Sequence, residues 1–144
     1  MKTHKLILFL TFLCLLGSVA GCGAKTAPAG DGFEIFIQND TGVDLAEIQI
    51  DFSLGEGTLG SAAGCHADGT PMKPGETMDF ELLREYFPEN ADLSLLQIQV
   101  TARNAEGLET EAHFPVKIDA AYGNSYQISL TGNAEDGYDA QRIS

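Results

Sequence analysis

The sequence predicts an all-β protein whose folded part is a two-layer antiparallel β-sandwich of six to seven strands. Apolar side chains alternate with polar ones through most of the chain after residue 32, as in strands with one buried face. Clusters of Gly, Pro, Asn and Asp separate these runs at the spacing of turns. No stretch has the period of a long amphipathic helix, and no strand–helix–strand alternation occurs. Several short strands bury their apolar faces as two packed sheets.

The charge and cysteine content exclude several classes of protein. The 144 residues hold 8 Lys+Arg against 21 Asp+Glu, a formal net charge of -13. Nucleic-acid binding requires clustered cations, which so acidic a chain lacks. Three cysteines do not supply a disulfide framework, so the fold must depend on a hydrophobic core. We expect one compact domain, since domains commonly have about 100–150 residues.

Residues 1–21 have the layout of a secretory signal peptide. Lys2 and Lys5 give the start a positive charge, an apolar run spans 6–16, and small residues follow. The run is about half of the ~20 residues that a membrane-spanning helix needs. Export followed by cleavage is therefore favoured over a permanent helical anchor.

The end of this segment, Val19-Ala20-Gly21-Cys22, resembles the lipobox of bacterial lipoproteins. The resemblance implies that a diacylglyceryl group is attached to the Cys22 thiol and that cleavage occurs just before Cys22. Acylation of the new amino terminus would add a further chain such as palmitate, and two or three chains anchor a protein durably. The mature protein would then be held at the cell membrane or outer membrane, facing away from the cytoplasm. The alternative is an ordinary signal peptide in which Cys22 occurs by chance.

Residues 22–32 are predicted to form a flexible tether that links the lipid to a folded domain over 33–131. After Cys22 they consist of Gly, Ala, Lys, Thr, Pro and Asp, with no apolar periodicity. Ten extended residues span at most about 35 Å, enough to lift a small domain clear of lipid headgroups.

Two strands are expected at the start of the domain, joined as a hairpin. Apolar and polar residues alternate over 33–38 and again over 47–53. Phe36 breaks the first alternation and suggests that this strand is covered on both faces. The intervening Asn-Asp-Thr-Gly at 39–42 is a turn sequence in which Gly42 can take a positive φ.

A long Gly-rich stretch, Gly55–Thr70, follows the hairpin. We expect a short irregular strand at 58–62 and then a surface loop, because structureless connections of this length are uncommon. Loops gather at the ends of sandwiches, so this stretch is the preferred recognition surface. Residues 77–82 are expected to form the next strand, followed by a helical turn that ends before Pro88.

The clearest strand covers 93–103, with its core face formed by Leu96, Ile98, Val100 and Ala102. The turn at 104–107 leads into a return strand with the expected inward residues Leu108, Thr110, Ala112 and Phe114. Pro115 ends this strand or marks it as an edge, because proline cannot donate to a central ladder. Alternating segments at 116–118 and 126–130 complete the sandwich. The polar, acidic residues 132–144 are predicted to be a disordered tail.

The number and length of these strands favour an immunoglobulin-like arrangement, although the Cys-Trp-Cys core of antibody domains is absent. The turn at 39–42 and the Pro-Gly-Glu turn at 74–76 resemble those of small secreted bacterial sandwich domains of unknown function. This resemblance covers residues 33–131. It implies a fold but does not indicate any particular activity.

Cys65-His66 is the sharpest candidate for chemistry, because a thiolate and an imidazole together can attack a carbonyl or bind zinc. Adjacent residues of an extended chain point to opposite faces, however, and His113 is the only other histidine after residue 21. The preferred interpretation is a lone thiol that is buried or pairs with another molecule. We expect no metal site, no catalytic residue and no cofactor.

Acidic clusters raise calcium binding as an alternative: Glu106, Glu109 and Glu111 surround one hairpin, and Glu135, Asp136 and Asp139 lie in the predicted tail. Their spacing does not match an EF-hand loop, and alternating acids are typical of a solvated strand face. A glycosidase could use carboxylates that lie far apart in the sequence. No Gly-x-Ser-x-Gly, Ser-x-x-Lys or His-Glu-x-x-His motif supports another hydrolase.

The sequence thus predicts a lipid-anchored, extracytoplasmic and non-enzymatic module that binds a ligand or assists an envelope complex. Its partners would be the membrane, through the lipid on Cys22, and a protein or small molecule. The alternatives are a small secreted hydrolase that uses a carboxylate pair or Cys65, and a calcium-stabilised adhesion module.

Overall fold

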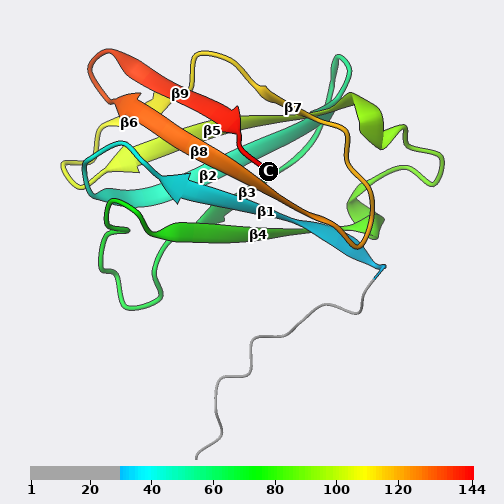
Figure 1. Ribbon diagram of the computed structural model, residues 1–144, viewed down its shortest axis with the longest axis horizontal. Coiled ribbons are helices and arrows are strands. Elements are labelled where there is room, and N and C mark those ends of the chain that lie inside the picture. Colours follow the sequence, from blue (N-terminus) through cyan, green and yellow to red (C-terminus); the bar gives the residue numbers. More distant parts are fainter. Residues whose placement is uncertain (1–29) are drawn as a thin grey trace, which may run out of the picture.

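The computed structural model describes residues 30–144, which form two β-sheets packed face to face (Figure 1). The strands are β1 (Gly32–Asn39), β2 (Leu45–Leu54), β3 (Gly57–Gly64), β4 (Thr77–Leu83), β5 (Leu96–Asn104), β6 (Glu109–Glu111), β7 (Val116–Ile118), β8 (Ser125–Asn133) and β9 (Gly137–Arg142). One sheet has the order β4-β1-β8-β9, and the other has the order β3-β2-β5-β6, with β7 also paired to β5. The predicted all-β sandwich is confirmed, with nine strands in the described residues instead of six to seven.

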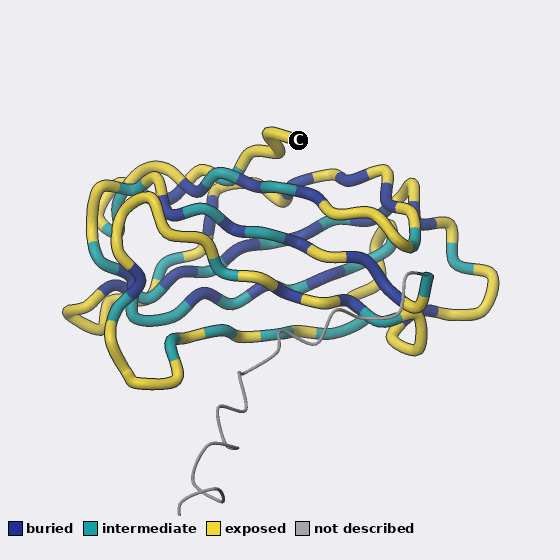
Figure 2. The backbone as a smooth tube through the Cα atoms, turned by 60° about the horizontal axis from the view of Figure 1, so that its bottom comes forward, coloured by how far each residue is buried: buried dark blue, intermediate teal, exposed yellow. Residues whose placement is uncertain are grey.

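The core lies between the sheets and is built from every second residue of the strands. In β5 the buried apolar residues are Leu96, Ile98, Val100 and Ala102, as predicted. β1 and β2 show the same alternation, and Figure 2 shows buried positions recurring along the strands of the sandwich. A slip of one residue would turn each apolar set toward solvent, so the pattern fixes the register of the strands.

The predicted hairpin between the first two strands is wrong. β1 pairs with β4 in antiparallel and with β8 in parallel orientation, whereas β2 pairs with β3 and β5 in the other sheet. The turn at 39–42 exists, with Gly42 at φ +77°, but it carries the chain from one sheet to the other. The buried side chain of Asn39 stabilises this crossing, because its Nδ2 donates to the carbonyls of Val43 (2.8 Å) and Met72 (3.2 Å).

The strand predicted at 58–62 within the Gly-rich stretch is confirmed as the longer β3, and the predicted surface loop follows it; the recognition role of Gly55–Thr70 stays a prediction. β3 pairs with β2 along its length, with a register shift at Phe52/Ser53, and only residues 65–71 remain as a loop. Two glycines on its inner face leave room for side chains of neighbouring strands. A Cβ at Gly60 would lie 2.8 Å from the Phe52 ring, and a Cβ at Gly64 would lie 2.9 Å from the Met78 side chain.

The segment after β4 confirms one prediction and adjusts another. The helical turn expected before Pro88 is the 3-10 helix η1 (Arg84–Tyr86). β5 starts three residues later than predicted, because a second 3-10 helix, η2 (Leu93–Leu95), precedes it. The Asp92 side chain accepts from the Ser94 N–H at 3.1 Å and so caps η2.

The return strand after the turn at 104–107 is shorter than predicted. β6 has three residues, and Leu108 and Phe114 are 49% and 75% exposed instead of facing the core. Ala112 is buried, as predicted, and Thr110 is half-buried. Pro115 has no N–H, so pairing with β5 stops before it and resumes in β7 against the other end of β5.

The disordered tail predicted for 132–144 is replaced by a strand. β9 pairs antiparallel with β8 over Gly137–Arg142 and adds a fourth strand to its sheet. Tyr138 is the largest fully buried side chain of the core. Its acidic neighbour Asp139 is exposed. The polar, acidic composition of the segment therefore predicted a tail, although one aromatic side chain faces the core.

The predictions for the amino-terminal segment concern residues 1–29, which lie outside the described part of the chain. The signal peptide, the cleavage motif at 19–22, lipidation of Cys22 and most of the tether at 22–32 therefore stay predictions. Among residues 30–144, no helix has the length and apolar character needed to cross a membrane.

Ile98→Ala should lower the free energy of unfolding by about 2–5 kcal/mol, because truncating a fully buried side chain leaves a cavity. Denaturant titration measures this difference. Gln97→Ala is the matched control: its half-buried side chain makes no hydrogen bond to the described residues, so the change should stay within about 0.5 kcal/mol. Equal losses in the two variants would contradict the assigned faces of β5.

Tyr138→Phe should leave the stability at neutral pH unchanged or raise it by up to about 1–3 kcal/mol. The Tyr138 hydroxyl is buried and has no hydrogen-bond partner among the described residues, so folding removes it from water without compensation. Denaturant titration of both proteins at neutral pH tests this. A loss above about 1 kcal/mol would mean that the hydroxyl has a partner after all.

The same residue should make stability depend on alkaline pH. Burial, reinforced by the negative charge of Glu106, raises the pKa of Tyr138 above its ordinary value of 10.0. The unfolded chain then loses the phenol proton at a lower pH than the folded protein does, so stability falls as pH rises above about 10. Tyr138→Phe should lose less stability over that range, which repeated denaturant titrations would show.

Candidate functional site

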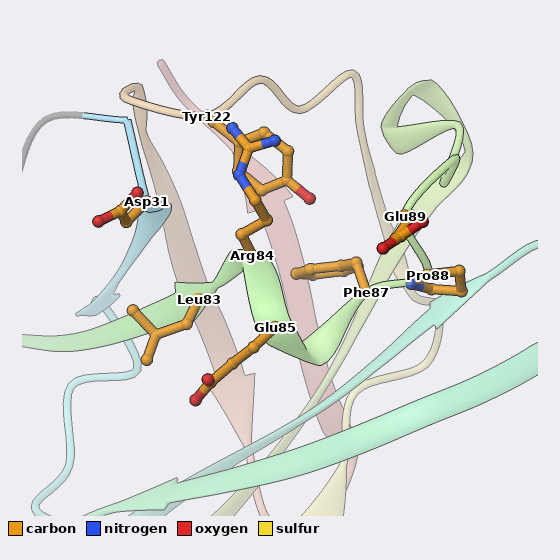
Figure 3. Close-up of a pocket in the computed structure, with 8 residues that line it drawn as sticks. All are labelled: Asp31, Leu83, Arg84, Glu85, Phe87, Pro88, Glu89 and Tyr122. Carbon is orange, nitrogen blue, oxygen red and sulfur yellow. The ribbon is translucent and has the colours of Figure 1, made fainter.

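A cavity of about 660 Å³ opens at the end of the sandwich where the described chain begins (Figures 1 and 3). Its lining comes from the residue before β1, from η1 with its flanks, and from the loop between β7 and β8. The lining residues are Asp31, Leu83, Arg84, Glu85, Phe87, Pro88, Glu89 and Tyr122. We term this cavity the entry pocket. Its volume falls within the roughly 300–1,000 Å³ that is common for small-molecule sites.

The aromatic wall of the entry pocket rests on the core. The ring centroid of Phe87 lies 5.5 Å from that of Phe33 in β1 and 5.8 Å from that of Phe52 in β2. Tyr122 joins the same group, 6.2 Å from Phe33 and 6.5 Å from Phe87. Rings from both sheets therefore fix Phe87. Pro88 favours the extended backbone of Phe87 and so ends the helical turn that presents it.

Arg84 connects this wall to the start of the domain. Its guanidinium carbon lies 4.0 Å from the centroid of the Tyr122 ring, as Figure 3 shows. Its Nη2 donates to the carbonyl of Gly30 at 3.1 Å, and its backbone N–H donates to the carbonyl of Asp31 at 2.7 Å. An exposed cation–π contact contributes about 0.5–1 kcal/mol. One arginine thus joins the entering chain, the turn after β4 and the loop before β8.

The charges around the entry pocket favour a cation. Three carboxylates, those of Asp31, Glu85 and Glu89, stand against the single guanidinium of Arg84, which already lies over a ring. Leu83, Phe87 and Pro88 supply apolar surface between these carboxylates. A flat group with delocalised positive charge, such as an amidinium or guanidinium, matches both features.

The structure does not bring Cys65 and His66 together with further reactive groups. Cys65 is free and exposed, not buried, and follows the end of β3. The Nδ1 atom of His66 lies 3.2 Å from the hydroxyl oxygen of Thr70. The hydroxyl and backbone N–H of Thr70 also donate to Asp68, and these hydrogen bonds lower the pKa of that carboxyl. The arrangement is a hydrogen-bonded loop.

The acidic clusters do not converge on a metal site. No group of three or more His, Cys, Asp or Glu residues among positions 30–144 is arranged to hold a metal ion. Glu109 and Glu111 are exposed, whereas Glu106 accepts from Asn104 at 2.7 Å. Asp139 lies 3.2 Å from the imidazole of His113.

A second cavity, of about 600 Å³, lies at the opposite end of the sandwich (Figure 1). It is bordered by the turns at 104–108 and 133–135 and by Val43 and Asp44. The carboxylate of Asp44 forms an ion pair with Lys73, whose Nζ lies 2.5 Å from Oδ2. This cavity has no aromatic wall, so the entry pocket is the better candidate for binding.

Sequence reasoning missed the residues of the entry pocket. Arg84 and Tyr122 are far apart in the sequence, and neither belongs to a motif. The available signal was the run Arg-Glu-Tyr-Phe-Pro at 84–88, in which an arginine and two aromatic residues precede a helix-ending proline. The helical turn itself was predicted from the spacing of Leu82, Leu83, Tyr86 and Phe87 before Pro88, which gave no indication of its partner across the fold.

Comparison with known proteins yields distant likenesses of fold. No family model and no curated protein matches the sequence of the chain.

Several solved structures are similar in fold, among them the following three. An NMR structure of a protein from Eubacterium rectale is 15% identical, with a TM-score of 0.45 over 84% of this chain and 93% of that one. The membrane-binding domain of pneumolysin is 11% identical, with a TM-score of 0.38 over 78% of this chain and 96% of that one. The type VI secretion lipoprotein TssJ1 from Pseudomonas aeruginosa is 11% identical, with a TM-score of 0.37 over 80% and 98% of the two chains.

Proposed function

We propose that this protein is a lipid-anchored extracytoplasmic β-sandwich that binds a flat cationic group in the entry pocket and catalyses no reaction. The group would belong to a small molecule or to a basic side chain of an envelope protein. The observation that carries the proposal is the joining of an aromatic wall with an excess of carboxylates in one cavity of about 660 Å³. Binding sites of this kind combine apolar walls with a few placed charges.

The lipid anchor rests on the lipobox-like sequence at 19–22 and on the apolar run before it. A mature amino terminus at Cys22 would leave a short linker before Gly30, where the described chain begins. The entry pocket would then lie at the end of the domain nearest the membrane. This placement gives the anchor a role in positioning the site.

Cys22→Ala should abolish lipid attachment and leave the precursor uncut, because the thiol is the acyl acceptor in the lipobox interpretation. Metabolic labelling with a fatty acid and mass spectrometry of the protein measure both effects. Cys65→Ala is the matched control and should keep the label. A labelled Cys22→Ala protein would contradict the assignment.

Benzamidinium should bind the entry pocket at least about tenfold more tightly than benzoate, its anionic counterpart of similar size and shape. The pocket's carboxylates attract the first probe and repel the second. Amide chemical shifts of residues 83–87, of Glu89 and of Tyr122 report the binding. Equal affinities for the two probes would contradict the cationic specificity.

Charge variants separate the electrostatic effect from the packing of the walls. Replacing both Glu85 and Glu89 with Gln keeps the shape of the pocket and should weaken benzamidinium severalfold. Glu109→Gln removes an exposed carboxylate of β6 that does not line the pocket, and it should leave the affinity unchanged. If both changes have the same effect, the net charge of the protein and not the pocket attracts the probe.

A further inference from the structure

The described part of the chain begins at the rim of the entry pocket. The carbonyl of Gly30 accepts from Nη2 of Arg84 at 3.1 Å, and the next residue, Asp31, lines the pocket (Figure 3). The backbone N–H of Gly123, in the loop between β7 and β8, donates to the carbonyl of Gly32 at 2.7 Å. Two lining elements therefore hold the start of the domain, so the chain that precedes Gly30 arrives at the pocket.

The entry pocket keeps an excess of negative charge. Among residues 30–144, none of its three carboxylates, those of Asp31, Glu85 and Glu89, forms an ion pair. The guanidinium of Arg84 balances one of the three charges and lies over the ring of Tyr122. A further cation in the pocket would therefore be attracted by the remaining carboxylates.

The other lysines and arginines of the described residues do not supply this cation. Lys73 and Arg103 form ion pairs with carboxylates outside the pocket. Arg142 lies over the ring of a tyrosine in β8. Lys117 belongs to β7 and does not line the pocket. The next candidate along the chain is the predicted tether.

We propose that Lys25 of the tether occupies the entry pocket of its own chain, with its ammonium against the carboxylates of Glu85 and Glu89. Lys25 is the only Lys or Arg between Cys22 and Gly30, and cleavage before Cys22 would retain it. Five residue steps separate it from Gly30, a reach of at most about 18 Å from the rim. The inference deepens the proposed function and rests on it, since Lys25 would compete with the cationic ligand for the same carboxylates.

The short connection decides how strong this competition is. A group on a short linker meets its site at an effective concentration of the order of millimolar. Pairs of exposed charges are weak, and both Glu85 and Glu89 are exposed. Lys25 would therefore fill the pocket for part of the time, and a pocket that is filled half of the time shows about half of its intrinsic affinity. The tether would raise the ligand concentration that is needed without preventing binding.

The affinity for benzamidinium tests the competition on the detergent-solubilised full chain. Lys25→Gln should raise this affinity at least about twofold, whereas Lys25→Arg keeps the positive charge and should leave it at the wild-type value. Lys73→Gln is the matched control, because it changes the net charge equally but at the opposite end of the sandwich, beside Asp44. An unchanged affinity in Lys25→Gln, or an equal rise in Lys73→Gln, would overturn the proposal.

Carbodiimide coupling tests the contact without any ligand. The reagent activates a carboxylate, a neighbouring amine attacks the carbonyl carbon to form an amide, and the reagent leaves as its urea. Peptide mass spectrometry should find Lys25 joined to Glu85 or Glu89 within one chain, and replacing both glutamates with Gln should remove this product. A link to Asp31 does not count, because Asp31 is close to Lys25 in the sequence. Lys73, at the other end of the sandwich, should join neither glutamate.

The two tests together separate this inference from the proposed function. If benzamidinium binds neither the wild type nor Lys25→Gln, the proposed function fails, and the cross-link still decides whether Lys25 lies in the pocket. If benzamidinium binds both equally, the inference fails and the proposed function stands. A cross-link from Lys25 to Glu85 or Glu89 that is absent, or that forms only between two chains, would also overturn the inference.

Discussion

The crossing at Asn39 is the constraint on which the two-sheet arrangement depends. Two sheets can share a core only if the chain passes between them without leaving buried polar groups unpaired. Asn39 is fully buried, and its Oδ1 accepts from the N–H (3.1 Å) and hydroxyl (2.7 Å) of Thr41. Its backbone N–H donates to Glu76, and its carbonyl accepts from Gly75. One residue therefore stabilises the crossing loop and the turn before β4, which leaves β1 free to lie between β4 and β8.

Local alternation predicted the strands and their inner faces but did not determine which strands pair. The alternation over 33–37 satisfies a hairpin and a two-sheet crossing equally well, because both bury the same side chains. The prediction for Phe114 failed because Pro115 breaks the ladder, so the strand ended before its pattern did. Tyr138 was overlooked because one inward residue among acids does not form a period. The hairpin error concerns a long-range pairing that short windows do not contain, whereas the other two concern a strand end and a segment without a period.

The entry pocket could not be derived from the sequence for a related reason. Its wall depends on Phe87 meeting Phe33 and Phe52, which come from different sheets. Sequence patterns indicate that these residues are buried but do not show which of them meet. Arg84 reaches Gly30 and Tyr122 only after β1, β4 and β8 have come together. The site is thus a product of the topology.

The anchor and the pocket impose a joint condition on the ligand. If Cys22 carries the lipid, eight residue steps separate it from Gly30, a reach of at most about 28 Å. The entry pocket could then approach the headgroups within this reach, while the acidic domain would be repelled by anionic lipids. Cations are enriched within about one Debye length, ~8 Å at physiological salt, of such a surface. A carboxylate-rimmed pocket that faces this layer meets cations at raised concentration and anions at lowered concentration. Under the proposed function, membrane charge and pocket charge would therefore select the same class of ligand.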